Sequence, residues 1–198
     1  MRIGIGIPTY DTWKAAMALS LIGALNRLQG IEYSIIARKG CYLDILREEC
    51  VQTALELKCD RLVFVDTDMM FPPEAIAQLL EAKKDIIGAA YNQKGLPLRS
   101  TVRLSDGKDA FLEGVPVPTQ PFKCAAVATG LMAINMHRLT DNMAPPYFAY
   151  ESAQRLKLAA KLGRGGEDVA FCVRAAECGL EVWCDPTIPV KHLGEFAY

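Results

Sequence analysis

Short apolar runs alternate with longer amphipathic segments along the first 91 residues of the chain. Four of the runs are brief enough for buried strands, at residues 2–7, 32–37, 61–65 and 85–91. Three segments carry helical spacing or helix-opening prolines, at residues 12–28, at 43–57 and from Pro72 and Pro73 onward. We expect Thr12 to cap the first helix. The alternation predicts an α/β fold with a mostly parallel central sheet.

The pattern changes after residue 91, where glycines, prolines and short β-like runs predominate. The predicted strands or β-like runs lie at residues 98–104, 110–112, 131–135, 181–184 and 188–191, with one helix at 167–178. Residues 138–165 are predicted to be rich in loops. We find no long linker, so we expect a single domain of residues 1–198, with a nucleotide-binding-like half (1–91) and a mixed, loop-rich half (92–198).

Composition narrows the class of protein. The 198 residues are 51% hydrophobic and 23% charged, which is typical of a globular domain and excludes a disordered chain. The net charge of -1 argues against a strongly basic nucleic-acid binder. We see no transmembrane run and no signal peptide, so we expect a soluble, cytoplasmic protein. The 7 cysteines form no CxxC pair, which favours reduced thiols over a zinc site.

Two carboxylates separated by one residue follow the buried run at residues 61–65: Asp66 and Asp68. In open α/β sheets, ligands bind at the carboxyl ends of the strands. Two adjacent carboxylates are costly there unless a cation or hydrogen bonds balance them, and Mg²⁺ or Mn²⁺ prefers such oxygen ligands. A simpler interpretation is that both acids cap the turn and helix that follow.

A second acidic pair, Glu167 and Asp168, follows Gly165 and Gly166 at a predicted helix start. Helix capping is the simpler interpretation, because a helix N-terminus favours negative charge. The functional interpretation is that one carboxylate serves as a general base. His192, one of 2 histidines, follows a predicted strand near the end of the chain, where a structural role is the commoner one.

These features occur in an order that resembles the GT-A glycosyltransferases, and more closely their small family-2-like members, which include phage and prophage proteins. The resemblance is carried by residues 7–10, by Asp44, Arg47 and residues 59–68, and by residues 129–134 and 177–186. It covers nearly the whole chain. It implies a GT-A (Rossmann-like) fold with helices on both faces of the sheet, and it makes 92–198 the acceptor-side half.

The resemblance implies a metal-dependent glycosyltransferase that moves a sugar from a UDP- or GDP-linked donor to an unknown acceptor hydroxyl. Inversion is the expected outcome, and retention stays open as the alternative, because GT-A folds serve both. Asp68 and His192 would bind Mn²⁺ or Mg²⁺, and Asp66 would bind the metal or the ribose. Asp168 would be the general base, and Glu167 would orient the acceptor.

The same resemblance implies a set of substrate-binding residues: Pro8, Thr9, Tyr10, Asp11, Arg47, Asp66, Lys94 and Gly130. The loop after the first strand would line the base and ribose pocket, although Asp11 stands where the family usually has asparagine. Lys94 would meet phosphate, with a solvated lysine as an equal alternative. The usual acceptor-binding patch after the Glu-Asp pair is missing.

Two other functions stay open. A nucleotidyltransferase shares a nucleotide-binding sheet and metal-binding carboxylates, but residues 5–9 lack the glycine-rich, basic first loop expected of one. A nucleotide-sugar-binding protein without turnover would keep the fold and lose the chemistry.

Overall fold

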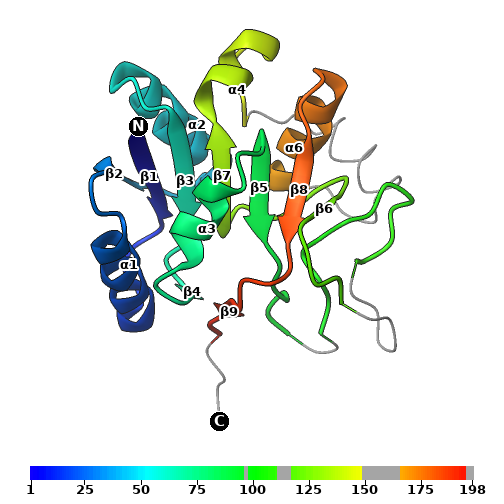
Figure 1. The fold of residues 1–198 in the computed structure, drawn as a ribbon, viewed down its shortest axis with the longest axis horizontal. Helices are drawn as coiled ribbons and strands as arrows, with labels where there is room; N and C mark the ends of the chain where they lie inside the picture. Colours follow the sequence, from blue (N-terminus) through cyan, green and yellow to red (C-terminus); the bar gives the residue numbers. More distant parts are fainter. Residues whose placement is uncertain (96–97, 111–116, 149–165, 195–198) are drawn as a thin grey trace.

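The computed structural model describes residues 1–95, 98–110, 117–148 and 166–194. The described strands are β1 (Arg2–Thr9), β2 (Glu32–Lys39), β3 (Arg61–Val65), β4 (Met69–Met70), β5 (Ile86–Ala89), β6 (Phe122–Lys123), β7 (Leu131–Asn135), β8 (Val182–Asp185) and β9 (Lys191–His192). The described helices are α1 (Ala15–Arg27), α2 (Leu43–Glu56), α3 (Ala75–Glu81), α4 (Met136–Asn142) and α6 (Glu167–Glu177). These elements build an α/β architecture of the Rossmann-like type (Figure 1).

Seven strands form one sheet in the order β2-β1-β3-β7-β5-β8-β6, and β4 pairs with β9 in a separate two-stranded sheet. Strands β1, β2, β3, β5 and β8 run in one direction, while β7 and β6 run in the other. The sheet is therefore mixed, with parallel strands in the majority. β5, from before residue 91, lies between β7 and β8, from after it, so both predicted halves contribute to one sheet.

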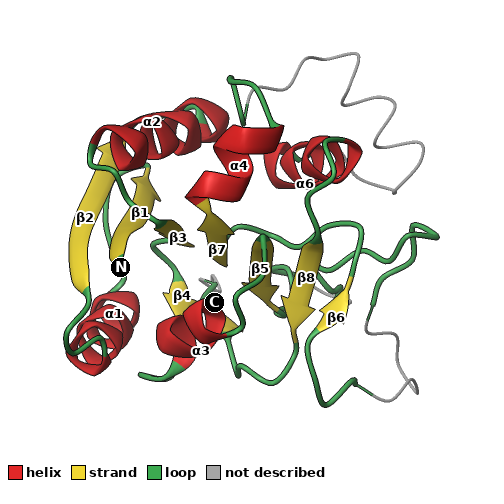
Figure 2. Cartoon of the chain, turned by 45° about the horizontal axis from the view of Figure 1, so that its top comes forward, coloured by secondary structure: helices red, strands yellow, loops and turns green. Residues whose placement is uncertain are grey.

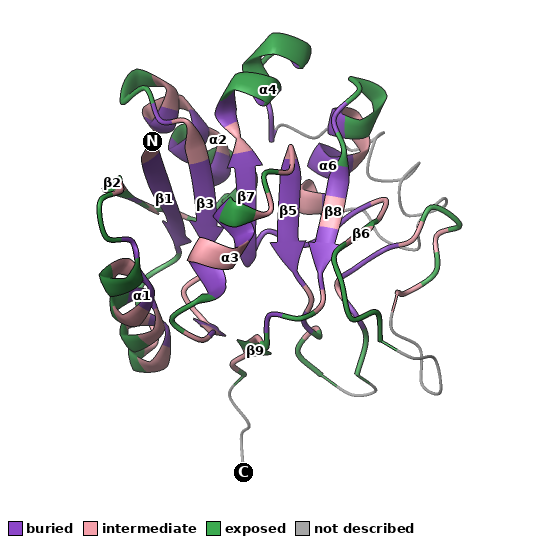
Figure 3. Ribbon diagram, in the orientation of Figure 1, coloured by how far each residue is buried: buried purple, intermediate pink, exposed green. Residues whose placement is uncertain are grey.

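Helices cover both faces of the sheet, as Figure 2 shows. On one face, α2, α4 and α6 bury residues such as Val51, Leu139 and Phe171 against β3, β5 and β7. On the other face, α1 and α3 bury residues such as Leu21 and Leu79 against β1 and β3. The central strands β1, β3, β5 and β7 between these layers are almost wholly buried, whereas the edge strand β2 is largely exposed (Figure 3). Burial on both faces explains why the central strands read as continuous apolar runs.

Several local predictions are wrong. Thr12 does not cap α1, because the helix begins at Ala15 with Lys14 at the N-cap position. Residues 98–104 form isolated bridges rather than a strand. The segment predicted to be rich in loops begins with α4, where Asn135 caps the helix by accepting the N–H of Arg138. Residues 111–112 of the run at 110–112, and most of 138–165, lie outside the described residues.

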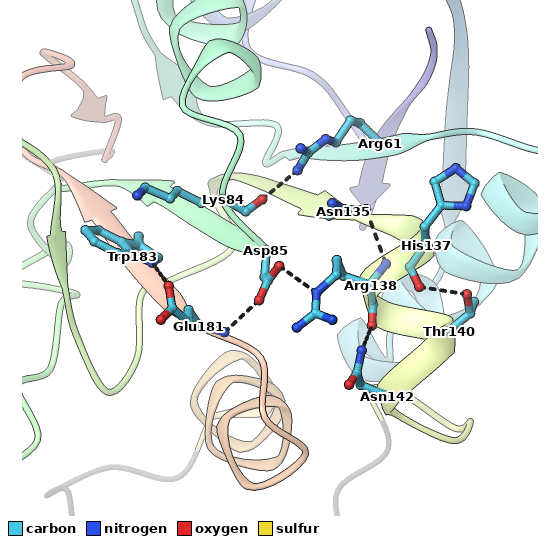
Figure 4. Close-up of polar contacts among 10 residues, drawn as sticks. All are labelled: Arg61, Lys84, Asp85, Asn135, His137, Arg138, Thr140, Asn142, Glu181 and Trp183. Carbon is cyan, nitrogen blue, oxygen red and sulfur yellow. Dashed lines mark hydrogen bonds and ion pairs between the residues drawn. The ribbon is translucent and has the colours of Figure 1, made fainter.

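A polar network ties together the amino ends of the parallel strands (Figure 4). Asp85, just before β5, accepts the Nε–H of Arg138 at 3.1 Å and the backbone N–H of Glu181 at 3.1 Å. Glu181 in turn accepts the indole N–H of Trp183 at 3.0 Å. These bonds link the starts of β5 and β8 to α4, at the edge opposite the carboxyl ends of β1, β3 and β5. The network stabilises the fold at this edge, and it lies away from the carboxyl edge, where the candidate residues are.

Gly88→Ala tests the closeness of packing behind β5. A Cβ at Gly88 would lie 2.7 Å from a methyl carbon of Val127, so we expect a loss of about 1–3 kcal/mol in unfolding free energy. Gly23→Ala on α1 is the matched control, because its Cβ would meet Pro73 at 3.4 Å, an ordinary contact. That helix substitution should gain about 0.5–1 kcal/mol. Denaturant unfolding measures both values, and a neutral Gly88→Ala would contradict the packing described.

Candidate active site

The predicted site residues gather at the carboxyl edge of the main sheet. Thr9 ends β1, Asp66 follows β3, and Tyr91 follows β5. Gly130 precedes the antiparallel β7 and so lies at the same edge, where its carbonyl accepts the N–H of Asp66 at 3.0 Å. In α/β sheets this edge is the usual ligand-binding edge.

Arg47 on α2 joins the two acidic motifs. Its guanidinium is 2% exposed, and its Nε–H donates to Glu167 Oε1 at 3.2 Å. On the other side, Nη1 lies 3.1 Å from Asp66 Oδ1 and Nη2 donates to Asp66 Oδ2 at 3.3 Å. The Phe64 ring lies beneath the guanidinium, 5.4 Å away. One buried cation therefore holds a carboxylate from after β3 and another from the start of α6.

Charge balance at Arg47 is strong enough to overcome its burial. Burial disfavours the guanidinium charge, but Asp66 and Glu167 outweigh that effect and raise the pKa of Arg47 above its usual value. Arg47 Nη1 and Asp66 Oδ1 form an ion pair at 3.1 Å, but the geometry of this contact is not that of a hydrogen bond. Among the described residues, these two atoms and Thr9 Oγ1 are buried without a hydrogen-bond partner. Nη1 and Oδ1 balance each other as an ion pair at 3.1 Å, so Thr9 Oγ1 is the one of the three left for a polar group of a ligand.

Asp168 is the acid of the second pair with a perturbed affinity for protons. Burial first, and the neighbouring Glu167 carboxylate second, raise its pKa to about 6, while Arg47 opposes this rise. Its Oδ1 accepts the backbone N–H of Val169 at 2.7 Å, so Asp168 also satisfies one N–H in the first turn of α6. The N-cap residue itself is Gly166. A carboxyl group with a pKa near neutrality is suited to general-base catalysis.

A second cluster forms around Asp68. Lys94 Nζ donates to Asp68 Oδ2, and His192 Nε2 lies 3.5 Å from Asp68 Oδ1. Although burial alone would raise the pKa of Asp68, His192 and Lys94 lower it to about 2. The pairing of β4 with β9 sets Met69 opposite His192, and the N–H of Leu193 donates to the carbonyl of Asp68 at 2.8 Å. Neither Asp66 nor Asp68 caps α3, which has Glu74 at its N-cap.

Tyr91 lies between the two clusters, and the sequence interpretation missed it. Its hydroxyl accepts the N–H of Gly130 at 2.9 Å, and its ring packs edge-on against His192 at 5.4 Å. Burial, followed by the charges of Asp66 and Asp168, raises its pKa well above the usual value. A tyrosine at the end of a predicted parallel strand was the available signal. A Cβ at Gly130 would lie 2.3 Å from the Tyr91 hydroxyl oxygen, which explains a glycine there.

The loop after β1 is only partly joined to these clusters. Pro8 and Thr9 are buried within β1, whereas Tyr10 is 75% exposed. Asp11 pairs with Lys39 at 2.9 Å. An exposed aromatic ring beside a charged pair is compatible with contacts to a base and a ribose, but the clusters around Arg47 and Asp68 are built without this loop.

The described side chains offer a divalent cation a pair of ligands and not a set of three. No group of three His, Cys, Asp or Glu residues within the described ranges is close enough to hold a metal. Asp66 presents both oxygens to Arg47, so Asp68 and His192 are the pair that remains. Their 3.5 Å separation is near the roughly 3 Å between adjacent ligands of an octahedral cation. Magnesium often has two protein ligands and takes the rest from phosphate and water.

A cavity of about 590 Å³ lies elsewhere, along α2. Its wall carries four carboxylates (Asp44, Glu48, Glu49 and Glu56) with Arg38. So acidic a wall disfavours a diphosphate, and the cavity shares no lining residue with the clusters above.

The fold and the carboxyl-edge site define an α/β protein of the Rossmann-like class. Its structure is similar to the crystal structure of A197 from STIV, with a TM-score of 0.67 and 20% sequence identity. The match covers 98% of this chain and 87% of that chain, so the likeness concerns the whole fold. No protein-family model and no curated protein sequence matches the chain. No helix within the described ranges has the length and apolar character needed to cross a membrane.

Replacing Arg47 tests its role in holding the acids. We expect Arg47→Met to lower the unfolding free energy by about 3–5 kcal/mol, since two largely buried carboxylates lose their partner. Arg47→Lys should recover little, because an ammonium group cannot contact both acids in a fork. Denaturant unfolding gives the values. Arg27→Met removes an exposed pair with Glu74 (3.6 Å) and should change stability little; equal losses for the two methionine variants would contradict the role assigned to Arg47.

Proposed function

We propose that this protein is a glycosyltransferase that moves a sugar from a nucleoside-diphosphate donor to an acceptor hydroxyl, with inversion. The observation that carries the proposal is the Arg47 bridge, which brings Asp66 to the Glu167–Asp168 pair at the carboxyl edge of the sheet. The motif order that resembles the GT-A glycosyltransferases supports it, as does the Rossmann-like fold. The whole of residues 1–198 would act as one domain.

In this proposal, several residues at the carboxyl edge of the sheet bind the donor. Thr9 Oγ1 is buried and has no hydrogen-bond partner among the described residues, while Arg47 would act from its ion pair with Asp66. Tyr10 offers an exposed ring to a nucleotide base, and Asp11 offers a carboxylate to the ribose. Lys94 supplies a positive charge for the diphosphate. Gly130 would serve through its backbone, because Tyr91 fills the space beside it.

Asp68 and His192 would hold Mn²⁺ or Mg²⁺ together with diphosphate oxygens. When bound, such a cation stabilises the negative charge that develops on the leaving nucleoside diphosphate. The assignment of Asp66 differs from that of Asp68, since Arg47 already neutralises it. In this proposal Asp66 orients Arg47 and the ribose rather than the metal.

Asp168 would remove the proton of the acceptor hydroxyl. The proton moves to the carboxylate, the oxygen bonds to the anomeric carbon, and the donor's phosphate oxygen departs with its bonding electrons. Displacement in one step inverts the configuration at that carbon. Glu167, fixed by Arg47, would hold Asp168 and the acceptor in place.

Transfer assays with UDP- and GDP-sugars and Mn²⁺ test the proposal. We expect one donor to bind and to release free nucleoside diphosphate, measured by calorimetry and by product chromatography. A parallel assay with nucleoside triphosphates and sugar 1-phosphates tests the alternative, because release of pyrophosphate from that mixture would identify a nucleotidyltransferase instead. Donor binding with no release against a broad acceptor panel would identify a binding protein, and no binding of any nucleotide sugar would contradict the proposal altogether.

Asp168→Asn tests the general base. We expect donor affinity within about twofold of wild type and turnover reduced by about 10²–10⁴-fold. Wild-type kcat/KM should fall as the pH drops below about 6, because protonated Asp168 cannot accept the acceptor's proton. Asp106→Asn, at an exposed aspartate paired with Lys108, is the matched control and should keep full turnover. Normal turnover in Asp168→Asn would reject this base.

A further inference from the structure

Both carboxylate oxygens of Asp68 already face nitrogen atoms. Lys94 Nζ is on Oδ2, and His192 Nε2 is on the Oδ1 side at 3.5 Å. The Lys94 contact is a charged hydrogen bond, whereas the His192 distance is long for one. Asp68 is therefore neutralised by the chain's own ammonium group at the position where the proposed function would place a divalent cation.

The orientation of His192 follows from Asn92. The backbone carbonyl of Asn92 lies 3.2 Å from His192 Nδ1, and a carbonyl can only accept, so Nδ1 carries a proton. In the neutral ring, Nε2 then presents its lone pair toward Asp68, which is the orientation that a metal ligand needs. A lone pair that faces a carboxylate is favourable only with a cation or a proton between them.

Asn92 and Lys94 lie on one segment, which follows β5. Through Asn92 this segment orients the histidine, and through Lys94 it occupies the carboxylate. Lys94 is 44% exposed, while Asp68 is 21% exposed, so the ammonium approaches from the solvent side on a flexible four-carbon stem. It can leave Asp68 without disturbing the core.

We propose that Lys94 and a divalent cation compete for Asp68, and that the displaced ammonium moves to the diphosphate of the bound donor. The second half of this inference, the movement of the Lys94 ammonium to the diphosphate, rests on the proposed function. An ammonium on Oδ2 and a divalent cation between Oδ1 and His192 would be two positive charges on one carboxylate, and their repulsion makes the lysine leave as the cation enters. The diphosphate offers the lysine a new anionic partner at the moment of displacement.

Manganese binding by the nucleotide-free protein tests the competition. We compare wild type, Lys94→Met and Lys94→Arg by electron paramagnetic resonance of free Mn²⁺. Lys94→Met should bind Mn²⁺ about tenfold more tightly than wild type, and Lys94→Arg should stay close to wild type because it keeps the competing charge. Lys108→Met, which removes a more exposed lysine–aspartate pair with Asp106 away from the site, should leave the affinity unchanged.

An affinity of Lys94→Met for Mn²⁺ equal to or weaker than that of wild type would overturn the competition. Calorimetry with UDP and GDP at saturating Mn²⁺ tests the second half, for which we expect about tenfold weaker nucleotide binding in Lys94→Met. Unchanged nucleotide affinity in Lys94→Met would overturn the claim that the displaced Lys94 ammonium moves to the diphosphate. Because the first measurement needs no nucleotide, the competition can hold while the glycosyltransferase proposal fails, and the reverse outcome is equally visible.

Discussion

The candidate site depends on one interaction, the buried guanidinium of Arg47 between Asp66 and Glu167. A cation with 2% of its side chain exposed is costly in the interior, and only its anionic partners make that position stable. The two acids follow β3 and open α6, about a hundred residues apart in the chain. The site can therefore form only when the start of α6 has docked on the sheet within reach of Arg47.

This arrangement divides the acids by function. Asp66 and Glu167 are fixed by the guanidinium and act through position. Asp168 is next to Glu167 but makes no direct bond with Arg47, and its pKa is raised toward neutrality as a result of burial and the adjacent charge. Asp68 lies outside the Arg47 cluster, with Lys94 and His192 as its partners. One fixed charge thus separates Asp168, which we propose as the base, from Asp68, which we propose as the cation-binding carboxylate.

The sequence predicts the layered part of the fold well, because buried strands and amphipathic helices have distinct periodicities. It also predicts Asp66, Asp68, Glu167, Asp168 and His192 as candidate residues, and the structure gathers them at one sheet edge. The sequence could not show that the Arg47 guanidinium contacts both carboxylate oxygens of Asp66. That contact depends on how α2 packs on β3, and the sequence pattern does not give this packing. The two-residue strands β4 and β9 carry no periodic signal, yet their pairing is what brings His192 to Asp68.

A double-mutant cycle between Arg47 and Glu167 tests this account most directly. The unfolding free energies of Arg47→Met, Glu167→Gln and the double variant give the coupling energy between these two residues, one from each predicted half of the chain. The account predicts a favourable coupling of about 1–3 kcal/mol. The double variant should therefore lose less unfolding free energy than the two single variants lose in sum. Losses that add to within about 0.3 kcal/mol would contradict the claim that Arg47 joins the two acidic motifs.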